Sequence, residues 1–292
     1  MHERFATSGS ASMHFGWLVQ SERLVAVKRT HPQLLGDAEE CGYTMRLAHP
    51  NVVPTLGVIR GPDEHLAVME YAPGASVAEL LDTLAIPIDP RIASALAAGA
   101  LRGLHAARTM RDVSPASILV AGDGQACLID FDLPGRHTGH TIIDKLPYTS
   151  PEQLLRGRID VRRDVYAVAV VLWEALTGQR LFRAPTVHGM LRMILTDGPV
   201  APPSRFAPWI SPAVDAAVLR GLARDPTVRF TSALEMAREL ERTAIATSSE
   251  IADWLEAIDP PYMRKRRSIA RAVTLRESKT LHSECSDRIP KM

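Results

Sequence analysis

Four charged residues stand far apart in this chain, and together they are the types that chemistry on a phosphate group needs. They are Lys28, Glu40, Asp112 and Asp130. A lysine can offset the negative charge of a phosphate, and carboxylates can hold a divalent cation or orient a hydroxyl. Each residue alone has a plainer explanation, because a strand lysine is usually solvated and a single aspartate usually caps a helix or a turn. The question is therefore whether the fold brings them together.

Alternating apolar residues predict two strands in the first quarter of the chain. In the segment at 23–29, the alternation places Lys28 on the same face as Ala26. The segment at 65–71 predicts a second strand. Between them, residues 37–51 predict a helix that carries the glutamate and ends before its proline.

A short hairpin explains how the two aspartates converge. Residues 117–120 and 125–129 predict its two strands, which a glycine-rich turn connects. Ser117 begins the first strand and Asp130 follows the second, so both lie at the same end. Asp112 lies in the loop that feeds this end. The hairpin therefore predicts one shared location for both acids.

After residue 71 the pattern becomes helical. Capping residues begin four predicted helices, at Ser76, Asp89, Ser211 and Ser232. The segment at 164–176 is apolar all round, as in a helix buried in a core. We therefore expect an α+β protein with a small antiparallel-sheet lobe at 3–71, which holds one helix, and a larger, mainly helical lobe at 72–243. Residues 244–292 are predicted to form a helical or partly disordered tail.

Composition excludes several functional classes. The chain has 292 residues, of which 46% are hydrophobic, so it can bury a sizeable core. Its net charge of +1 gives no field that favours nucleic acid. The longest apolar stretch, at 165–176, is shorter than the roughly 20 residues that span a bilayer. Scattered cysteines at 41, 127 and 285 fit a reducing compartment. We expect a cytoplasmic protein without a membrane span or a nucleic-acid partner.

The tail carries a basic run at 264–267. Such a run can contact an acidic partner or a membrane surface. A solvated face is the plainer expectation for it.

The order of short motifs along the chain carries more information than any one of them. They are VAVK at 25–28, Glu40 ahead of HPN at 49–51, VMEY at 68–71, RD at 111–112, DF at 130–131, SPE at 150–152, DVY at 164–166 and DPxxR at 225–229. In this order they resemble the eukaryotic-like (Hanks-type) serine/threonine protein kinases of bacteria, and they look closest to the myxobacterial kind. The resemblance runs from about Phe5 to about Leu240, and it implies the two-lobed protein-kinase fold.

The resemblance also implies roles for the charged residues. It makes Lys28 the cation on the α- and β-phosphates of ATP, with Glu40 as its helix partner. Asp112 becomes the base that orients the substrate hydroxyl, and Asp130 holds Mg²⁺ or Mn²⁺. The implied partner is a protein substrate or docking protein.

Further positions are implied to bind the nucleotide or to support the site. The nucleotide set is Ala6, Gly9, Met13, Ala26, Lys28, Met69, Glu70, Tyr71 and Leu119. Within it, Ala26 and Leu119 resemble the two walls of the adenine site. Glu152 and Arg229 resemble an ion pair that ties down the activation segment, and Asp164 resembles a buried acid that holds the catalytic loop.

Several positions depart from the family pattern. The phosphate-covering loop at 6–11 lacks the three motif glycines and keeps only the neighbouring Gly9, so we expect weakened nucleotide contact. Met110 replaces a histidine, and Asp132 replaces the glycine of the DFG motif. Ser117 replaces the asparagine that is the second metal ligand, and a hydroxyl is a poorer ligand than an amide carbonyl.

One pair of departures is reciprocal. Ser114 stands where the family has a catalytic-loop lysine, and Lys145 stands where the family has an activation-segment threonine. One hypothesis is that Lys145 supplies the missing cation to Asp112 and the transferring phosphate. The plainer hypothesis is a solvated loop lysine.

These observations leave open a slow protein kinase and a pseudokinase, which would act as a nucleotide-modulated scaffold. Retention of all four charged residues favours the kinase, and the departures favour the pseudokinase. A small-molecule phosphotransferase is disfavoured by Glu152, Asp164 and Arg229.

Overall fold

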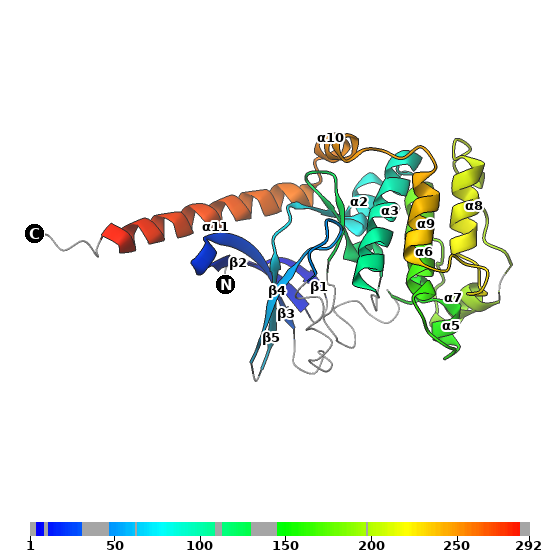
Figure 1. The fold of residues 1–292 in the computed structure, drawn as a ribbon, viewed down its shortest axis with the longest axis horizontal. Coiled ribbons are helices and arrows are strands. Elements are labelled where there is room, and N and C mark those ends of the chain that lie inside the picture. Colours follow the sequence, from blue (N-terminus) through cyan, green and yellow to red (C-terminus); the bar gives the residue numbers. More distant parts are fainter. Residues whose placement is uncertain are drawn as a thin grey trace, which may run out of the picture.

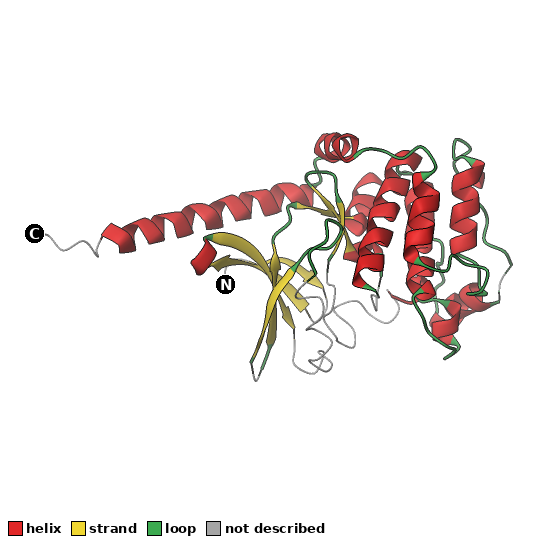
Figure 2. Cartoon of the chain, in the orientation of Figure 1, coloured by secondary structure: helices red, strands yellow, loops and turns green. Residues whose placement is uncertain are grey.

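The protein has a small sheet lobe beside a larger helical lobe, and a long C-terminal helix runs past the small lobe (Figure 1 and Figure 2). The computed structural model describes residues 4–8, 11–30, 47–61, 63–108, 113–129, 145–196 and 198–286. The predicted two-lobed α+β fold is confirmed.

The small lobe is an antiparallel sheet with the strand order β1-β2-β3-β5-β4. Its strands are β1 (Arg4–Ser8), β2 (Ala11–Leu18), β3 (Arg23–Thr30), β4 (Thr55–Arg60) and β5 (His65–Glu70), with a 3₁₀ turn at Val19–Ser21. Both predicted strands are present, although β5 ends at Glu70, one residue early. Most of the helix expected at 37–51 lies outside the described residues.

The register of this sheet determines which side chains share a face with Lys28. Lys28 lies opposite Met13 on β2 and Ala67 on β5. Directly opposed residues in an antiparallel pair point to the same face, so these side chains share one face of the sheet. Phe15 and Ala26 are an opposed pair on that same face.

The large lobe combines a second small sheet with a set of packed helices. The strands, in the order β6-β7-β8, are β6 (Gly74–Ser76), β7 (Ile118–Ala121) and β8 (Ala126–Leu128). Its helices are α2 (Val77–Leu84), α3 (Pro90–Ala107), α5 (Pro151–Leu154), α6 (Arg162–Thr177), α7 (Val187–Leu195), α8 (Pro212–Gly221) and α9 (Ala233–Glu241), with 3₁₀ turns η4 (Pro115–Ser117), η5 (Leu146–Tyr148) and η6 (Pro203–Arg205). Every residue of α6 from Asp164 to Thr177 is buried, as its unbroken apolar pattern predicts.

Hydrogen bonds at the helix starts confirm the predicted caps. The Ser76 hydroxyl accepts from the backbone N–H of Glu79 at 3.2 Å, and the Glu79 carboxylate accepts from the backbone N–H of Ser76 at 2.8 Å. This capping box begins α2. The side chains of Asp89, Ser211 and Ser232 likewise accept backbone N–H groups at the starts of α3, α8 and α9.

The tail forms two helices, α10 (Ser248–Ile258) and α11 (Pro261–Ser286), and they pack on the rest of the molecule. Ile251 and Leu255 of α10 belong to the main core of the large lobe. The expectation of a solvated basic run was wrong for Arg266, whose side chain is largely buried and ion-paired. No helix within the described ranges combines the length and the apolar character that a bilayer crossing requires.

Candidate active site

Lys28 lies in the interior of the molecule, on the central strand β3. Only 3% of the residue is exposed. An ammonium group is costly to bury unless acceptors or an anion accompany it. This burial therefore fits a lysine whose ammonium group pairs with an anion, either a carboxylate or a bound phosphate. Its expected partner, Glu40, lies outside the described residues.

An apolar cluster lies between the two sheets and brings together three residues predicted to bind the nucleotide. We call it the interlobe cluster; it consists of Met13, Val53, Met69, Ala72, Leu119, Cys127 and Ile129. Met13 and Met69 come from the small lobe, and Leu119 comes from β7 of the large lobe. Ala26 is buried and lies opposite Met69 in the sheet. Apolar walls of this kind suit a flat aromatic base.

Glu70 and Tyr71 form the connection out of β5, and both side chains have other contacts. The Glu70 carboxylate accepts a hydrogen bond from the Arg23 guanidinium at 2.9 Å. The Tyr71 ring lies edge-on to Phe15, with the ring centroids 5.1 Å apart.

Ser117 lies at the predicted end of the hairpin, but it is part of the 3₁₀ turn η4 and not of the strand. The N–H of Ile129 donates to its carbonyl at 3.0 Å, which places the residue before Asp130 beside it. The Ser117 hydroxyl donates to the Ser114 carbonyl at 2.8 Å and accepts from the Ser114 N–H at 2.9 Å. One lone pair remains for a metal, so this serine fits only as a weak ligand.

The described part of the chain holds no larger cluster of metal-binding side chains. Asp130, the stronger predicted ligand, lies outside it. Within the described ranges, no three His, Cys, Asp or Glu side chains cluster closely enough to hold a cation.

The reciprocal pair of departures meets at one small cavity. Ser114 and Lys145 both line it, together with Val113, Tyr148, Thr149, Gln153, Arg163, Asp164 and Ala167. Lys145 precedes η5, and its carbonyl accepts from the Thr149 hydroxyl at 3.2 Å. The buried Asp164, at the start of α6, lies on the same cavity. Lys145 therefore lines the same cavity as Ser114, the residue that stands where the family has a catalytic-loop lysine.

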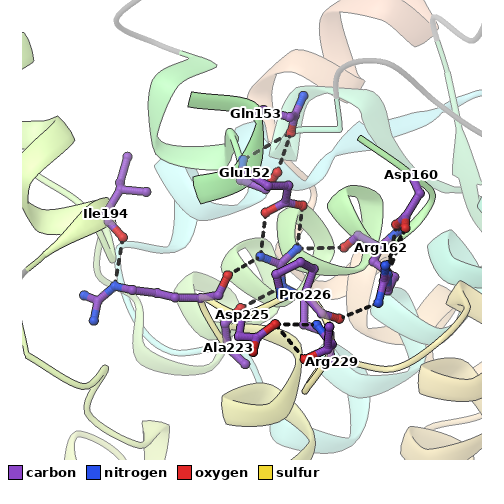
Figure 3. A network of polar contacts seen from close by, with 12 residues as sticks. Glu152, Gln153, Asp160, Arg162, Ile194, Ala223, Asp225, Pro226 and Arg229 are labelled. Atoms are coloured by element: carbon purple, nitrogen blue, oxygen red, sulfur yellow. Dashed lines mark hydrogen bonds and ion pairs between the residues drawn. The ribbon is translucent and has the colours of Figure 1, made fainter. Parts of the chain in front are cut away.

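The predicted ion pair between Glu152 and Arg229 is present and fully formed (Figure 3). Both terminal nitrogens of Arg229 donate to the carboxylate at 2.8 Å. The guanidinium also donates to the carbonyls of Ala223, Arg162 and Arg224, at 2.7, 3.2 and 3.1 Å. This two-pronged geometry joins α5, α6 and the segment before α9.

The electrostatics of this pair follow from its geometry. Burial by itself would raise the pKa of Glu152. The hydrogen bonds and charge of Arg229, with hydrogen bonds from its own backbone and from Ser150, outweigh burial and hold the pKa of Glu152 below its ordinary value. The carboxylate is therefore ionised in the folded protein at neutral pH.

A comparison with known families gives the same interpretation as the geometry. The sequence profile of the protein kinase domain matches residues 8–242. The chain belongs to the protein kinase domain family. The match includes the interlobe cluster, Lys28 and both partners of the Glu152–Arg229 pair.

Curated relatives of this kinase domain include mycobacterial serine/threonine-protein kinases. PknD of Mycobacterium tuberculosis (strain ATCC 25618 / H37Rv) is 33% identical over 238 residues, which cover 75% of this chain and 35% of the relative. PknB of Mycolicibacterium smegmatis is 31% identical over 257 residues, which cover 80% of this chain and 41% of the relative. PknL of Mycobacterium tuberculosis (strain CDC 1551 / Oshkosh) is 30% identical over 259 residues, which cover 82% of this chain and 64% of the relative.

This kinase domain thus spans between 35% and 64% of the length of those three relatives. The likeness to the myxobacterial kind stays a prediction.

The predicted site divides into a described and an undescribed part. Gly9, Glu40, Asp112 and Asp130 lie outside the described residues, as do Met110 and Asp132. Ala6 lies on β1 opposite Met13. The described part holds the apolar walls, the buried lysine and the supporting ion pair.

The sequence analysis did not predict that Val53 and Cys127 belong to the interlobe cluster, or that Phe15 lies beside the candidate site. Phe15 follows Met13 by two residues on β2 and shares its face, but the sequence analysis predicted no strand there. Cys127 lies opposite Leu119 in the hairpin, so the predicted hairpin register pointed to it.

Proposed function

We propose that this kinase domain transfers the γ-phosphoryl group of ATP to serine or threonine side chains of a protein, at a reduced rate. The observation that carries the proposal is the convergence of the buried Lys28 with the interlobe cluster, inside a chain of the protein kinase domain family. Bound Mg²⁺ or Mn²⁺ would supply charge that offsets the phosphates. A protein substrate and a cytoplasmic location are part of this proposal, and the buried free thiol of Cys127 fits a reducing compartment.

Each residue has a proposed task. Met13, Ala26, Met69 and Leu119 enclose the adenine, and Lys28 holds the α- and β-phosphates. Ala6, Gly9, Glu70 and Tyr71 line the site through their backbone groups. Glu40 orients the lysine, Asp112 receives the hydroxyl proton of the substrate, and Asp130 with Ser117 holds the metal.

The reduced rate follows from the metal side of the site. Ser117 has two hydrogen bonds to Ser114, so its hydroxyl is already committed to shaping the loop. The missing glycines of the phosphate-covering loop weaken the hold on the nucleotide further. Each tenfold loss of rate corresponds to only about 1.4 kcal/mol. The same observations favour the alternative, a pseudokinase that binds nucleotide and docks a partner.

Lys145 has a proposed catalytic task, because it shares a cavity with Ser114. In this proposal it supplies the cation to Asp112 and the transferring phosphate. Lys145→Ala is expected to lower the rate of transfer by about 100-fold, as expected for the loss of one charge-stabilising group. Adding Ser114→Lys to the Lys145→Thr variant restores the family arrangement and is expected to recover most of the rate. An unchanged rate in Lys145→Ala overturns this part of the proposal.

The reaction class is tested with ATP labelled at the γ- or the α-phosphate, a generic basic protein, and Mg²⁺ or Mn²⁺. We expect the parent to transfer label to serine or threonine from γ-labelled ATP but not from α-labelled ATP. The Asp112→Asn variant is expected to transfer no label from either. Label from the α-position would contradict the proposal. So would the absence of label together with intact nucleotide binding, which is the pseudokinase outcome.

A further inference from the structure

The helix α11 contacts the small lobe through an apolar face. Ile269 and Val273 are buried, and with Phe15 of β2 they form a third cluster that is separate from the other two. Leu24, Tyr71 and Ala270 pack at its edges. Figure 1 shows α11 passing beside β2 and then extending beyond the sheet.

Phe15 connects this cluster to the nucleotide site. It is 0% exposed and lies opposite Ala26, on the face of the sheet that also carries Met13 and Lys28. Tyr71, in the connection between the lobes, meets it edge-on. The contacts of α11 therefore fall on the strand that holds one wall of the proposed adenine site and on the link between the lobes.

The same helix is tied to the large lobe by Arg266. Its guanidinium forms an ion pair with Glu79 of α2, and one of its nitrogens also donates to the Gly74 carbonyl of β6 at 3.3 Å. The two side chains are 14% and 17% exposed. Glu79 already caps α2 through Ser76, so the arginine binds a carboxylate that is fixed in place.

The spacing of these residues explains how one helix can contact both lobes. Arg266, Ile269 and Val273 follow each other by three and four residues, which places them along one face of the helix. The arginine contacts Gly74 and Glu79 of the large lobe, whereas the two apolar residues pack with Phe15 of the small lobe. Burial raises the pKa of Tyr71 above its ordinary value, and the charges of Arg266 and Arg267 offset only part of that rise.

We propose that α11 is a clamp across the two lobes, which positions β2 over the adenine and so raises the affinity for ATP. Arg266, Ile269 and Val273 are positioning residues in this proposal, because they act on the site through Phe15 and Gly74. The proposal rests on the proposed nucleotide site. It makes the tail a regulatory element, since anything that displaces α11 lowers nucleotide affinity.

The test uses the full chain with Arg266→Gln, and separately with Ile269→Ala and Val273→Ala together. We expect each to weaken ATP binding about fivefold or more, the lower end of typical coupling between sites. The KM for ATP is expected to rise with little change in kcat. Arg266→Lys keeps the charge and is expected to retain most of the affinity. Arg264→Gln and Leu275→Ala are matched controls on exposed positions of the same helix, and they are expected to bind as the parent does.

Amide hydrogen exchange tests the clamp independently of ATP binding, so it distinguishes failure of the clamp from failure of the proposed nucleotide site. Arg266→Gln is expected to speed exchange in β2 and at 74–76, whereas Arg264→Gln is not. Unchanged exchange and unchanged ATP affinity in Arg266→Gln overturn the clamp. If exchange changes but neither parent nor variant binds ATP, the proposed nucleotide site fails while the clamp between the lobes stands.

Discussion

At the scale of residues, the most informative groups are charges inside the protein. The Arg229 side chain is 0% exposed, and Glu152 neutralises it with two hydrogen bonds. A buried pair of this kind contributes little relative to an apolar pair, but the loss of one partner leaves an uncompensated charge. The pair therefore fixes the position of α5 relative to α6. Loss of either partner is expected to destabilise the folded protein strongly.

Glu152→Gln is expected to destabilise the folded protein by about 3 kcal/mol, because Arg229 would stay buried without an anion. Urea unfolding at neutral pH measures this loss. Glu239→Gln is the matched control, since the Glu239–Arg242 pair lies on the surface with its charged atoms 3.9 Å apart. Its expected effect is below about 0.5 kcal/mol.

The effect of Glu152→Gln also has an expected pH dependence. The pKa of Glu152 is lower in the folded protein than its ordinary value of about 4.5. The stability from this carboxylate is thus present above that ordinary value and is lost as pH falls through the lower, folded value. Parent and variant should converge in stability in acid. A difference that stays constant down to acid pH would mean that the charge of Glu152 is not what stabilises the pair.

The role of a residue was predictable where the residue belongs to a sequence motif. It was less predictable where the role depends on contacts with residues that only the fold brings close. The sequence located Glu152 and Arg229 by their motifs, and the structure confirms the pair. Ser117 was expected to act through its hydroxyl, but the two hydrogen bonds to Ser114 that limit it depend on the 3₁₀ turn. The signal for this turn was the capping serine Ser114 followed by Pro115, which the sequence analysis did not use.

At the scale of elements, the local signals predicted most helices and strands correctly, but they did not predict how the tail packs on the two lobes. The capping box of α2, the hairpin β7–β8 and the buried helix α6 all follow from patterns within a few residues. The role of α11 does not, because its apolar positions are spread through a basic segment. Their partner, Phe15, lies about 250 residues earlier in the chain.

The hairpin turn gives a test of how the tail is docked. Gly124 has a φ of +82°, and a Cβ there would lie 1.9 Å from the Ser248 carbonyl at the start of α10. Gly124→Ala is expected to destabilise the protein by about 2 kcal/mol or more, from the left-handed backbone and the clash together. Thermal unfolding measures this effect.

Gly122→Ala is the control for this turn, since its Cβ would meet only the Pro73 carbonyl at 3.5 Å, an ordinary contact. Its expected effect is within about 0.5 kcal/mol. Equal stability of the two variants would argue that α10 does not rest on the hairpin turn.

At the scale of the whole molecule, the chain is a kinase domain, and the residues of its proposed site come from both lobes. The lobes meet at the interlobe cluster, and α11 contacts both of them. The two-lobed architecture was predictable because each lobe has its own local pattern. The placement of the tail against both lobes was not, because it depends on the assembled surface of Phe15, Tyr71 and Glu79.

The measurement that tests the account most directly is the initial rate of γ-phosphoryl transfer by the parent, Lys28→Met and Arg29→Met. Arg29 is the neighbour of Lys28 on the same strand, but it is exposed. We predict slow transfer by the parent, a loss of about 100-fold or more in Lys28→Met, and no loss in Arg29→Met. Transfer that is absent in all three proteins, or equal in all three, would contradict the account.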